Sequence, residues 1–288
     1  MSKDLVSAEG IKIYNGQQEI RITTAPSDIG NTNDIKIDLQ KINIGDFTPY
    51  VIKKNRLEGL LTGTVDIIDP FGKLQVDVKG EAEQFRLDDD SVGKIQLGAN
   101  YNQRTGAINF NGVSDNLDYR FDLKGLYNML DSASDKQLDI VTNFKDTKIN
   151  LLNRYLSTVF SSVGGLATGQ LRIVGSPKSL NYIGKVALKD GKLTVAYTNV
   201  TYLIPQAAFD FKEGIIEFGS FQLRDTLGNI GSVTRGRLRH RSFNKMDFDF
   251  ALNTNKLLVL NTNALSKDPF YGKVIAKATL TFSGPMED

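Results

Sequence analysis

A short motif, Gly-Leu-Xaa-Thr-Gly, occurs twice in this chain, at residues 59–63 and again at residues 165–169. The two copies begin 106 residues apart, and each opens a run in which apolar and polar residues alternate. Alternation with a period of two is typical of a β-strand with one buried and one wet face. A repeat of strands without repeated catalytic side chains predicts a long β-surface rather than an enzyme active site.

The same alternation continues along most of the chain. Clear examples are residues 35–39, 74–78, 117–123, 193–197 and 248–252. Strands that are apolar on one face only are typical of an antiparallel sheet covered on one side. Turn residues separate the strands, and Asp190-Gly191 is the strongest hairpin signal because both residues tolerate positive φ.

One segment, residues 150–163, departs from the alternation. Its apolar residues recur at helical spacing, at Leu151, Leu152, Tyr155, Leu156, Val159, Phe160 and Val163. Asn150 is suited to cap the amino end of a helix and Gly164 to stop it. We therefore predict an all-β chain, an open twisted sheet that forms a groove, with one short amphipathic helix near 150–163.

The repeats also predict the organisation of the chain. Residues 1–56 supply leading strands, residues 57–164 a first β-block that ends in the helix, and residues 165–288 a second β-block. No low-complexity linker separates these parts, so we expect one continuous architecture rather than tethered domains.

Composition narrows the chemistry. The 35 basic and 33 acidic residues give a net charge of +2, too balanced to predict a nucleic-acid partner. The chain has no cysteine and one histidine, which excludes disulfides, thiolate zinc sites and His-rich metal sites. We expect no cofactor and no enzymatic activity.

The chain contains no run of about 18 apolar residues, so no membrane-spanning helix is predicted. The amino end has no signal-peptide core, so the chain is either cytosolic or part of a longer exported protein.

Two charged segments allow more than one interpretation. Asp88, Asp89 and Asp90 could form a calcium loop, but they lack the spaced ligands and terminal Glu of one, and a solvated turn fits better. A strand at residues 235–241 carries arginine at every second position. Arg235, Arg237, Arg239 and Arg241 are therefore either headgroup or phosphate contacts or the wet face of that strand. The wet face is the preferred interpretation.

The carboxy-terminal third carries a succession of further motifs. They are Asp-Thr-Leu-Gly-Asn at 225–229, Gly-Arg-Leu-Arg-His at 236–240 followed by Phe243, Phe-Asp-Phe at 248–250, Asn-Lys-Leu-Leu-Val-Leu-Asn-Thr at 255–262, Phe-Tyr-Gly-Lys at 270–273 and Ser-Gly at 283–284. This succession resembles the carboxy-terminal region of the TamB proteins, in the AsmA-like superfamily, as found in Bacteroidetes-type bacteria. The two Gly-Leu-Xaa-Thr-Gly blocks and the Gly175-Ser176-Pro177 turn are similar to repeats of the same family. The resemblance covers most of residues 35–284.

The resemblance implies an elongated, U-shaped β-structure with an apolar inner groove, called a β-taco. It implies a periplasmic location, in a full-length chain anchored in the inner membrane and reaching the outer membrane. It also implies outer-membrane biogenesis, either by conducting phospholipid along the groove or by assisting barrel insertion with a partner of the TamA or BamA kind. The sequence has neither the amino-terminal anchor nor the aromatic carboxy-terminal segment that engages this partner, so we expect an internal fragment.

The alternating apolar residues are the candidate groove lining, and phospholipid acyl chains are the expected occupant. The candidates are Ile35, Ile37, Leu39, Val65, Ile67, Leu74, Val76, Val78, Ile95, Leu97, Phe110, Tyr119, Phe121, Leu171, Ile173, Leu193, Val195, Tyr197, Phe209, Phe211, Phe218, Phe248, Phe250 and Leu252. Acyl chains need only a dry lining, since each buried CH₂ gains about 0.8 kcal/mol whatever it touches. If the apolar faces instead close on each other, the fold is a β-sandwich. Two alternative functions also remain: an assembly factor that offers a sheet edge to incoming barrel strands, and a structural β-solenoid.

Overall fold

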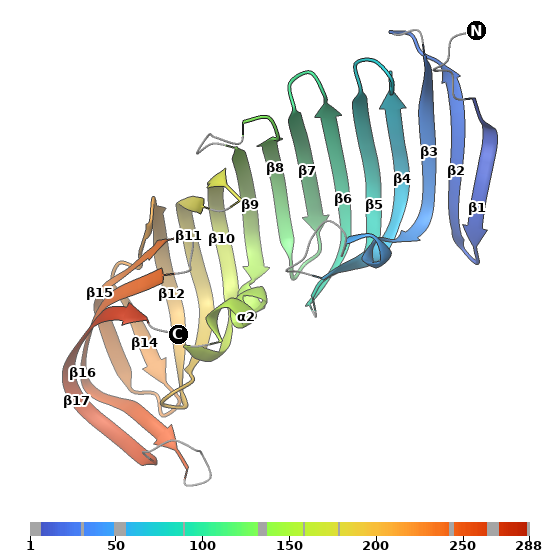
Figure 1. Cartoon of the computed structure of the whole chain (residues 1–288). Helices are drawn as coiled ribbons and strands as arrows, with labels where there is room; N and C mark the ends of the chain where they lie inside the picture. The colour runs from blue at the N-terminus through green and yellow to red at the C-terminus, as the bar shows by residue number, and fades with distance from the viewer. Residues whose placement is uncertain are drawn as a thin grey trace. The chain divides into compact units, whose positions relative to one another are not determined.

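The computed structural model describes residues 7–29, 32–48, 56–88, 90–131, 137–157, 159–177, 179–241, 245–263 and 271–286. These residues form seventeen strands, β1 to β17, and three short helical elements. The helical elements are η1 (Ile44–Asp46), η2 (Ile149–Leu152) and α2 (Asn153–Leu156). All the strands belong to one sheet, and every strand pair with a resolved register is antiparallel. The predicted all-β fold class, an open antiparallel sheet, is confirmed (Figure 1).

The chain divides into two compact units, residues 1–142 and residues 143–288, and the boundary falls inside β9 (Leu138–Lys148). Unit 1 contains the first Gly-Leu-Xaa-Thr-Gly motif and unit 2 contains the second. Each unit is described by itself.

Unit 1 is a simple meander in which each strand pairs with the next one in the chain (Figure 1). Its strands are β1 (Glu9–Asn15), β2 (Gln18–Pro26), β3 (Asn33–Asn43), β4 (Leu57–Ile68), β5 (Gln75–Leu87), β6 (Asp90–Asn102), β7 (Ala107–Asp115) and β8 (Arg120–Asn128). Such local pairing follows from short hairpin connections between alternating segments.

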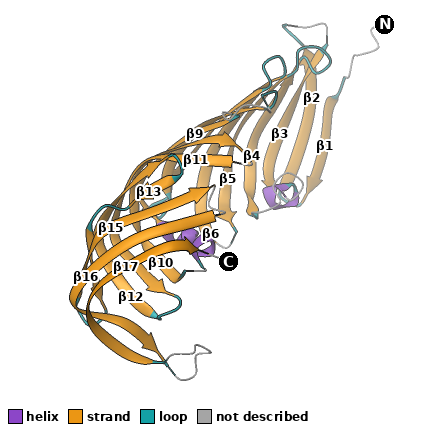
Figure 2. Ribbon diagram, turned by 60° about the vertical axis from the view of Figure 1, so that its left-hand side comes forward, coloured by secondary structure: helices purple, strands orange, loops and turns teal. Residues whose placement is uncertain are grey.

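Unit 2 continues the meander with one variation. Its strands are β10 (Phe160–Ser176), β11 (Ser179–Val195), β12 (Val200–Lys212), β13 (Ile215–Glu217), β14 (Phe221–Asp225), β15 (Ile230–Arg241), β16 (Lys245–Thr262) and β17 (Gly272–Met286). Both β13 and β14 pair with β12 on one side and with β15 on the other, so together they act as one interrupted strand. Figure 2 shows β16 and β17 bending together, side by side.

The repeated threonine of the motif fastens the preceding strand. In the first copy Lys41 adopts a φ of 50°, and its backbone N–H donates to Thr62 Oγ1 over 3.1 Å. In the second copy Asp146 adopts a φ of 49° and donates to Thr168 Oγ1 over 2.9 Å. The hydroxyl therefore satisfies a backbone donor that a residue in the left-handed region has turned away from the regular ladder.

The repeated glycines accommodate the strand that follows. Gly59 and Gly165 have φ values of 150° and 129°, at points where the pairing register shifts. Side chains rarely tolerate such backbone conformations. A Cβ on Gly63 or Gly169 would overlap a backbone carbonyl oxygen of the next strand. The motif is thus a structural device that sets strand register and close approach, and it carries no chemistry of its own.

The helix predicted over residues 150–163 is wrong in extent. Helical structure ends at Leu156, and the chain enters β10 at Phe160. Val163 pairs with Leu193 in the sheet instead of lying on a helical stripe. The Ser, Thr and Val residues between Leu156 and Gly164 are weaker helix formers, and the sheet offers a backbone ladder to the residues from Phe160 on.

Three predicted cap and turn residues also have other roles. Asn150 lies inside η2 rather than before it, and Gly164 is paired within β10. The hairpin predicted at Asp190-Gly191 is wrong, because both residues lie inside β11. Asp190 has the positive φ that the prediction required, 51°, but the bulge uses it opposite Gly165. Local residue propensity therefore predicted the positive φ of Asp190 correctly, but it did not predict that this residue would form a bulge within a strand instead of a hairpin turn.

Candidate functional site: an apolar sheet face

Strand register brings the apolar residues of unit 1 into three rows on one face of the sheet. The first row is Ile22, Ile37, Val65, Val78, Ala99 and Phe110. The second is Ile35, Ile67, Val76, Tyr101, Ile108 and Tyr127. The third alternates Ile20, Leu39, Leu97 and Leu123 with Gly63, Gly80 and Gly112. Directly opposite residues share a face, so these rows form one apolar surface over β2 to β8.

The opposite face of unit 1 carries the charges. Lys36 stands across from Asp66, which in turn stands across from Asp77. The carboxylate of Asp77 accepts a hydrogen bond from the side-chain amide of Asn100 on β6. In these strands water-compatible groups therefore dominate one side and hydrocarbon the other.

The apolar face of unit 1 stays partly accessible. Of the sixteen buried apolar residues in the described part of the chain, four lie in unit 1: Ile42, Ala82, Val92 and Tyr119. The members of the three rows are instead half-buried by their own neighbours in the sheet. Surface of this kind marks a binding or packing site, because an apolar face left in water is unfavourable.

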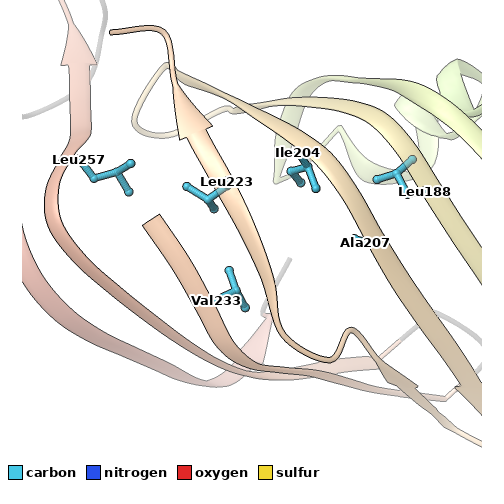
Figure 3. Packing of buried hydrophobic residues seen from close by; sticks show 6 residues of the cluster. All are labelled: Leu188, Ile204, Ala207, Leu223, Val233 and Leu257. Atoms are coloured by element: carbon cyan, nitrogen blue, oxygen red, sulfur yellow. The ribbon is translucent and has the colours of Figure 1, made fainter. Parts of the chain in front are cut away.

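Unit 2 is different, because its apolar side chains converge on one another. Figure 3 shows Leu188, Ile204, Ala207, Leu223, Val233 and Leu257 gathered from five strands into one buried cluster. Leu257 of β16 points toward Leu223 of β14 (Figure 3). Twelve of the sixteen buried apolar residues belong to this unit. The alternative in which apolar faces close on each other thus applies to part of unit 2.

The predicted lining residues of unit 1 fall on the open face, with two exceptions. Those with the phase of that face are Ile35, Ile37, Leu39, Val65, Ile67, Val76, Val78, Ile95, Leu97, Phe110 and Phe121. Leu74 lies just before β5, outside the paired strands. Tyr119 lies in the turn before β8, where its side chain is buried.

The predicted lining residues of unit 2 are distributed over more than one environment. Leu193, Phe209, Phe250 and Leu252 pack against the buried cluster. Phe218 follows β13, and its ring meets those of Phe209 and Phe250 at centroid distances of 5.4 and 5.6 Å. Tyr197 lies in the turn after β11 and is 60% exposed. The other members, on the strands, are Leu171 and Ile173 of β10, Val195 of β11, Phe211 of β12 and Phe248 of β16.

Sequence reasoning missed the segment that closes unit 2. β15 begins at Ile230, and the second half of β16 runs past that end; we call residues 255–262 the strap. Leu257 and Leu258 in the strap are 0% and 1% exposed. The signal was the run of four apolar residues at 257–260, which breaks the alternation and marks burial on both sides of the chain.

A buried carboxylate holds the strap. Asp225, at the end of β14, is 1% exposed and accepts a hydrogen bond from the backbone N–H of Leu258 over 2.7 Å. It also accepts bonds from the backbone N–H groups of Leu227 and Asn229 and from the Asn229 side chain. Beside it, the Tyr202 hydroxyl donates to the Leu258 carbonyl over 2.9 Å. Four donors on one buried carboxylate make this a fully satisfied polar centre.

The pKa values of this centre follow from its contacts. Burial acts to raise the pKa of Asp225, but hydrogen bonds from the Asn229 side chain and from three backbone N–H groups outweigh it and hold the pKa below its usual 3.8. Burial, and then the charge of Asp225, raise the pKa of Tyr202 to about 12. The carboxylate stays ionised and the phenol stays protonated across the neutral range.

The lowered pKa of Asp225 predicts an acid-dependent loss of stability. Its contribution is fully present above the unfolded-state value near 3.8 and is lost as pH falls through the lower folded-state pKa. Urea unfolding at pH 7 should therefore show a more stable wild-type chain than Asp225→Asn, and the gap should narrow below pH 3.8. A gap that stays constant with pH would contradict this assignment.

The arginines of β15 lie on its wet face among carboxylates. The pairs are Arg235–Asp249 (2.9 Å), Arg237–Glu217 (3.3 Å) and Arg239–Asp247 (3.5 Å). His240 is buried on the other face, against Tyr182 at a centroid distance of 6.0 Å, and burial lowers its pKa. The side chain of Arg241 lies outside the described residues. Each paired arginine already meets an anion of the chain itself.

These ion pairs are exposed and are expected to contribute little. Replacing Arg235 and Arg239 together by Gln should change the free energy of unfolding by no more than about 0.5 kcal/mol. Flotation with anionic liposomes should also be unchanged at low salt, where screening is slight. A large loss of anionic-lipid binding in the double variant would show instead that these arginines contact headgroups.

Comparison of the chain with family models, with curated proteins and with solved structures finds no match.

No helix in the described part of the chain has the length and apolarity needed to cross a membrane. Among those same residues, no group of three or more His, Asp or Glu side chains is arranged to hold a metal ion. Asp89 of the acidic run lies outside them; Asp88 and Asp90 flank the turn between β5 and β6.

Proposed function

We propose that this chain is a periplasmic segment of a TamB-like protein of outer-membrane biogenesis, and that its apolar face carries phospholipid acyl chains. In the full-length, inner-membrane-anchored protein, such faces would line a route toward the outer membrane. The observation that carries this proposal is the set of three apolar rows over β2 to β8, which are only half-buried. The proposal gives the chain no catalytic role.

The chemistry of the rows suits hydrocarbon better than a polar ligand. The residues are aliphatic or aromatic with glycine between them, and the charged side chains of these strands point to the other face. An acyl chain needs continuous dry contact and no directional partner, and its burial gains about 0.8 kcal/mol per CH₂. In these rows the polar side-chain atoms are the hydroxyls of Tyr101 and Tyr127, so the surface can hold many lipids and select none by its headgroup.

Lipid analysis of the purified chain tests this proposal. For this test the chain is fused to a signal peptide and produced in the periplasm of a diderm bacterium. It is then purified without detergent and extracted with organic solvent, and the extract is analysed by mass spectrometry. We expect phospholipid at a constant ratio to protein. A lipid-free preparation whose apolar face is covered by self-association, detected by light scattering, would contradict the proposal.

The same preparation distinguishes the alternatives. Binding of unfolded barrel strands by lipid-free protein would favour an assembly factor acting with a TamA- or BamA-type partner through β-augmentation. Binding of neither lipid nor strands would favour a structural β-solenoid.

A further inference from the structure

In unit 2 the chain covers its own apolar face. The strap lies over the side chains of β11, β12 and β14, and Leu257 completes their buried cluster. Its middle is held by Asp225 and Tyr202, both of which bond to the backbone of Leu258. In unit 1, by contrast, the described residues leave the three apolar rows only half-buried.

The far end of the strap is held by two hydrogen bonds to one turn. The Asn261 N–H donates to the Thr198 carbonyl over 2.9 Å, and the Asn199 side-chain amide donates to the Asn261 carbonyl over 3.1 Å. Two anchoring points, one at the end of β14 and one at the β11–β12 turn, therefore fix the strap over the face.

We propose that the strap is a displaceable cover over a second hydrocarbon-binding surface. That surface consists of Leu188, Ile204, Ala207, Leu223 and Val233. The inference rests on the proposed function, because it assigns to this surface the same acyl-chain ligand as the open face of unit 1. Leu257 occupies the place of that ligand until the ligand displaces it.

The construction of the strap allows it to lift as a unit. Its ladder to β17 continues through this segment, from Leu257 opposite Ala276 to Thr262 opposite Gly272. Both strands bend together (Figure 2), and Val274 and Ile275 on β17 are each 44% exposed. The two-stranded ribbon can therefore move without breaking its own ladder, while the two anchoring points and the apolar contacts of Leu257 and Val259 with the cluster open.

An acyl chain is a suitable replacement for the Leu257 side chain. Contacts in the cluster are non-directional, so hydrocarbon from a lipid can take over the contacts of Leu257 with little loss. The polar anchors are then the elements that keep the strap closed in the absence of ligand. Weakening an anchor should favour the open state and should increase access for hydrocarbon.

Tyr202→Phe and Asp225→Ala weaken the middle anchor by different amounts. Tyr202→Phe removes one hydroxyl hydrogen bond, whereas Asp225→Ala removes a carboxylate with four donors. Asp249→Ala is the matched control, because this aspartate also lies on β16 but pairs with Arg235 at the exposed face. If Asp225→Ala does not fold, Tyr202→Phe carries the test alone.

The test uses the whole chain and palmitic acid with a photoreactive diazirine on its acyl chain. Hydrogen exchange first reports the strap: backbone exchange in residues 255–262 should be about tenfold faster in Tyr202→Phe than in wild type or Asp249→Ala. Peptide mass spectrometry then locates the photolabel. We expect label on β2 to β8 in all four proteins, and at least a fivefold gain of label on residues 186–207 and 221–233 in the weakened variants.

The outcomes separate the two proposals. Label on unit 1 with no gain on unit 2, although exchange shows a loosened strap, overturns the inference and leaves the proposed function intact. Equal labelling of unit 2 in wild type also overturns it, because the strap would then be no cover. Label on unit 2 in the weakened variants, with no label on unit 1 in any of the proteins, supports the inference and contradicts the proposed function. No label in either unit contradicts both.

Discussion

Gly169→Ala is expected to destabilise unit 2 by about 3 kcal/mol, the upper part of the range for overpacking. A Cβ at this position would overlap the carbonyl oxygen of Lys185 on β11, and a backbone group in a central strand cannot move aside as a flexible side chain can. The strands must separate locally, which weakens the ladder between β10 and β11. Urea unfolding followed by circular dichroism measures the effect.

Gly164→Ala is the matched control on the same strand. The nearest atom to a Cβ there, Oδ1 of Asn150, lies 3.7 Å away, which is ordinary contact. This variant should be as stable as wild type or up to about 1 kcal/mol more stable, since alanine restricts the unfolded chain. Equal losses in the two variants would show that the motif glycines are not required for close strand approach.

Val78→Glu is expected to abolish phospholipid occupancy, with at least a tenfold loss of copurified lipid. Val78 lies in the middle of the open face, opposite Val65 on β4 and Ala99 on β6. A carboxylate there would have to lose water whenever hydrocarbon covers it, which is strongly unfavourable. Val78 is only half-buried, so without lipid the carboxylate can reach water and the fold survives.

Lys79→Glu is the control for this prediction, because Lys79 is the next residue on β5 and points to the wet face. It changes charge by more than Val78→Glu does, yet it should leave the lipid content unchanged. Mass spectrometry of both variants, with circular dichroism to verify folding, makes the comparison. Normal lipid content in Val78→Glu would mean that the face of unit 1 does not hold lipid.

Much of the sheet could be predicted from alternation alone. The strands around residues 35–39, 74–78 and 248–252 are present, and the Arg235 and His240 side chains lie on opposite faces, as predicted. Alternation succeeds there because side-chain direction in a regular strand depends only on position parity. The helix ending at Leu156 was predicted too long, because local spacing carries no information on the ladder that residues 160–163 gain.

Odd or even position in the sequence no longer predicts the face of a side chain once a strand contains a bulge. Leu188 and Leu193 differ by an odd number of positions, yet both contact the buried cluster of unit 2. The positive φ of Asp190 between them marks the bulge that reverses the phase of β11. The aspartate and glycine were visible as a turn signal, but their use in mid-strand depends on pairing with the bulged β10, which is not a local property.

The sequence by itself determined that this chain forms one-sided strands, that a motif recurs in it, and that charge and hydrocarbon separate onto opposite faces. Those properties are local, because they follow from residue type and from a period of two. Tertiary structure decided which apolar residues stay accessible and which are covered. The strap reaches Asp225 across 33 residues of sequence, and its burial of Leu257 and Leu258 depends on the sheet curling toward it. Curvature is the summed effect of bulges and twist over many strands, so no single segment encodes it.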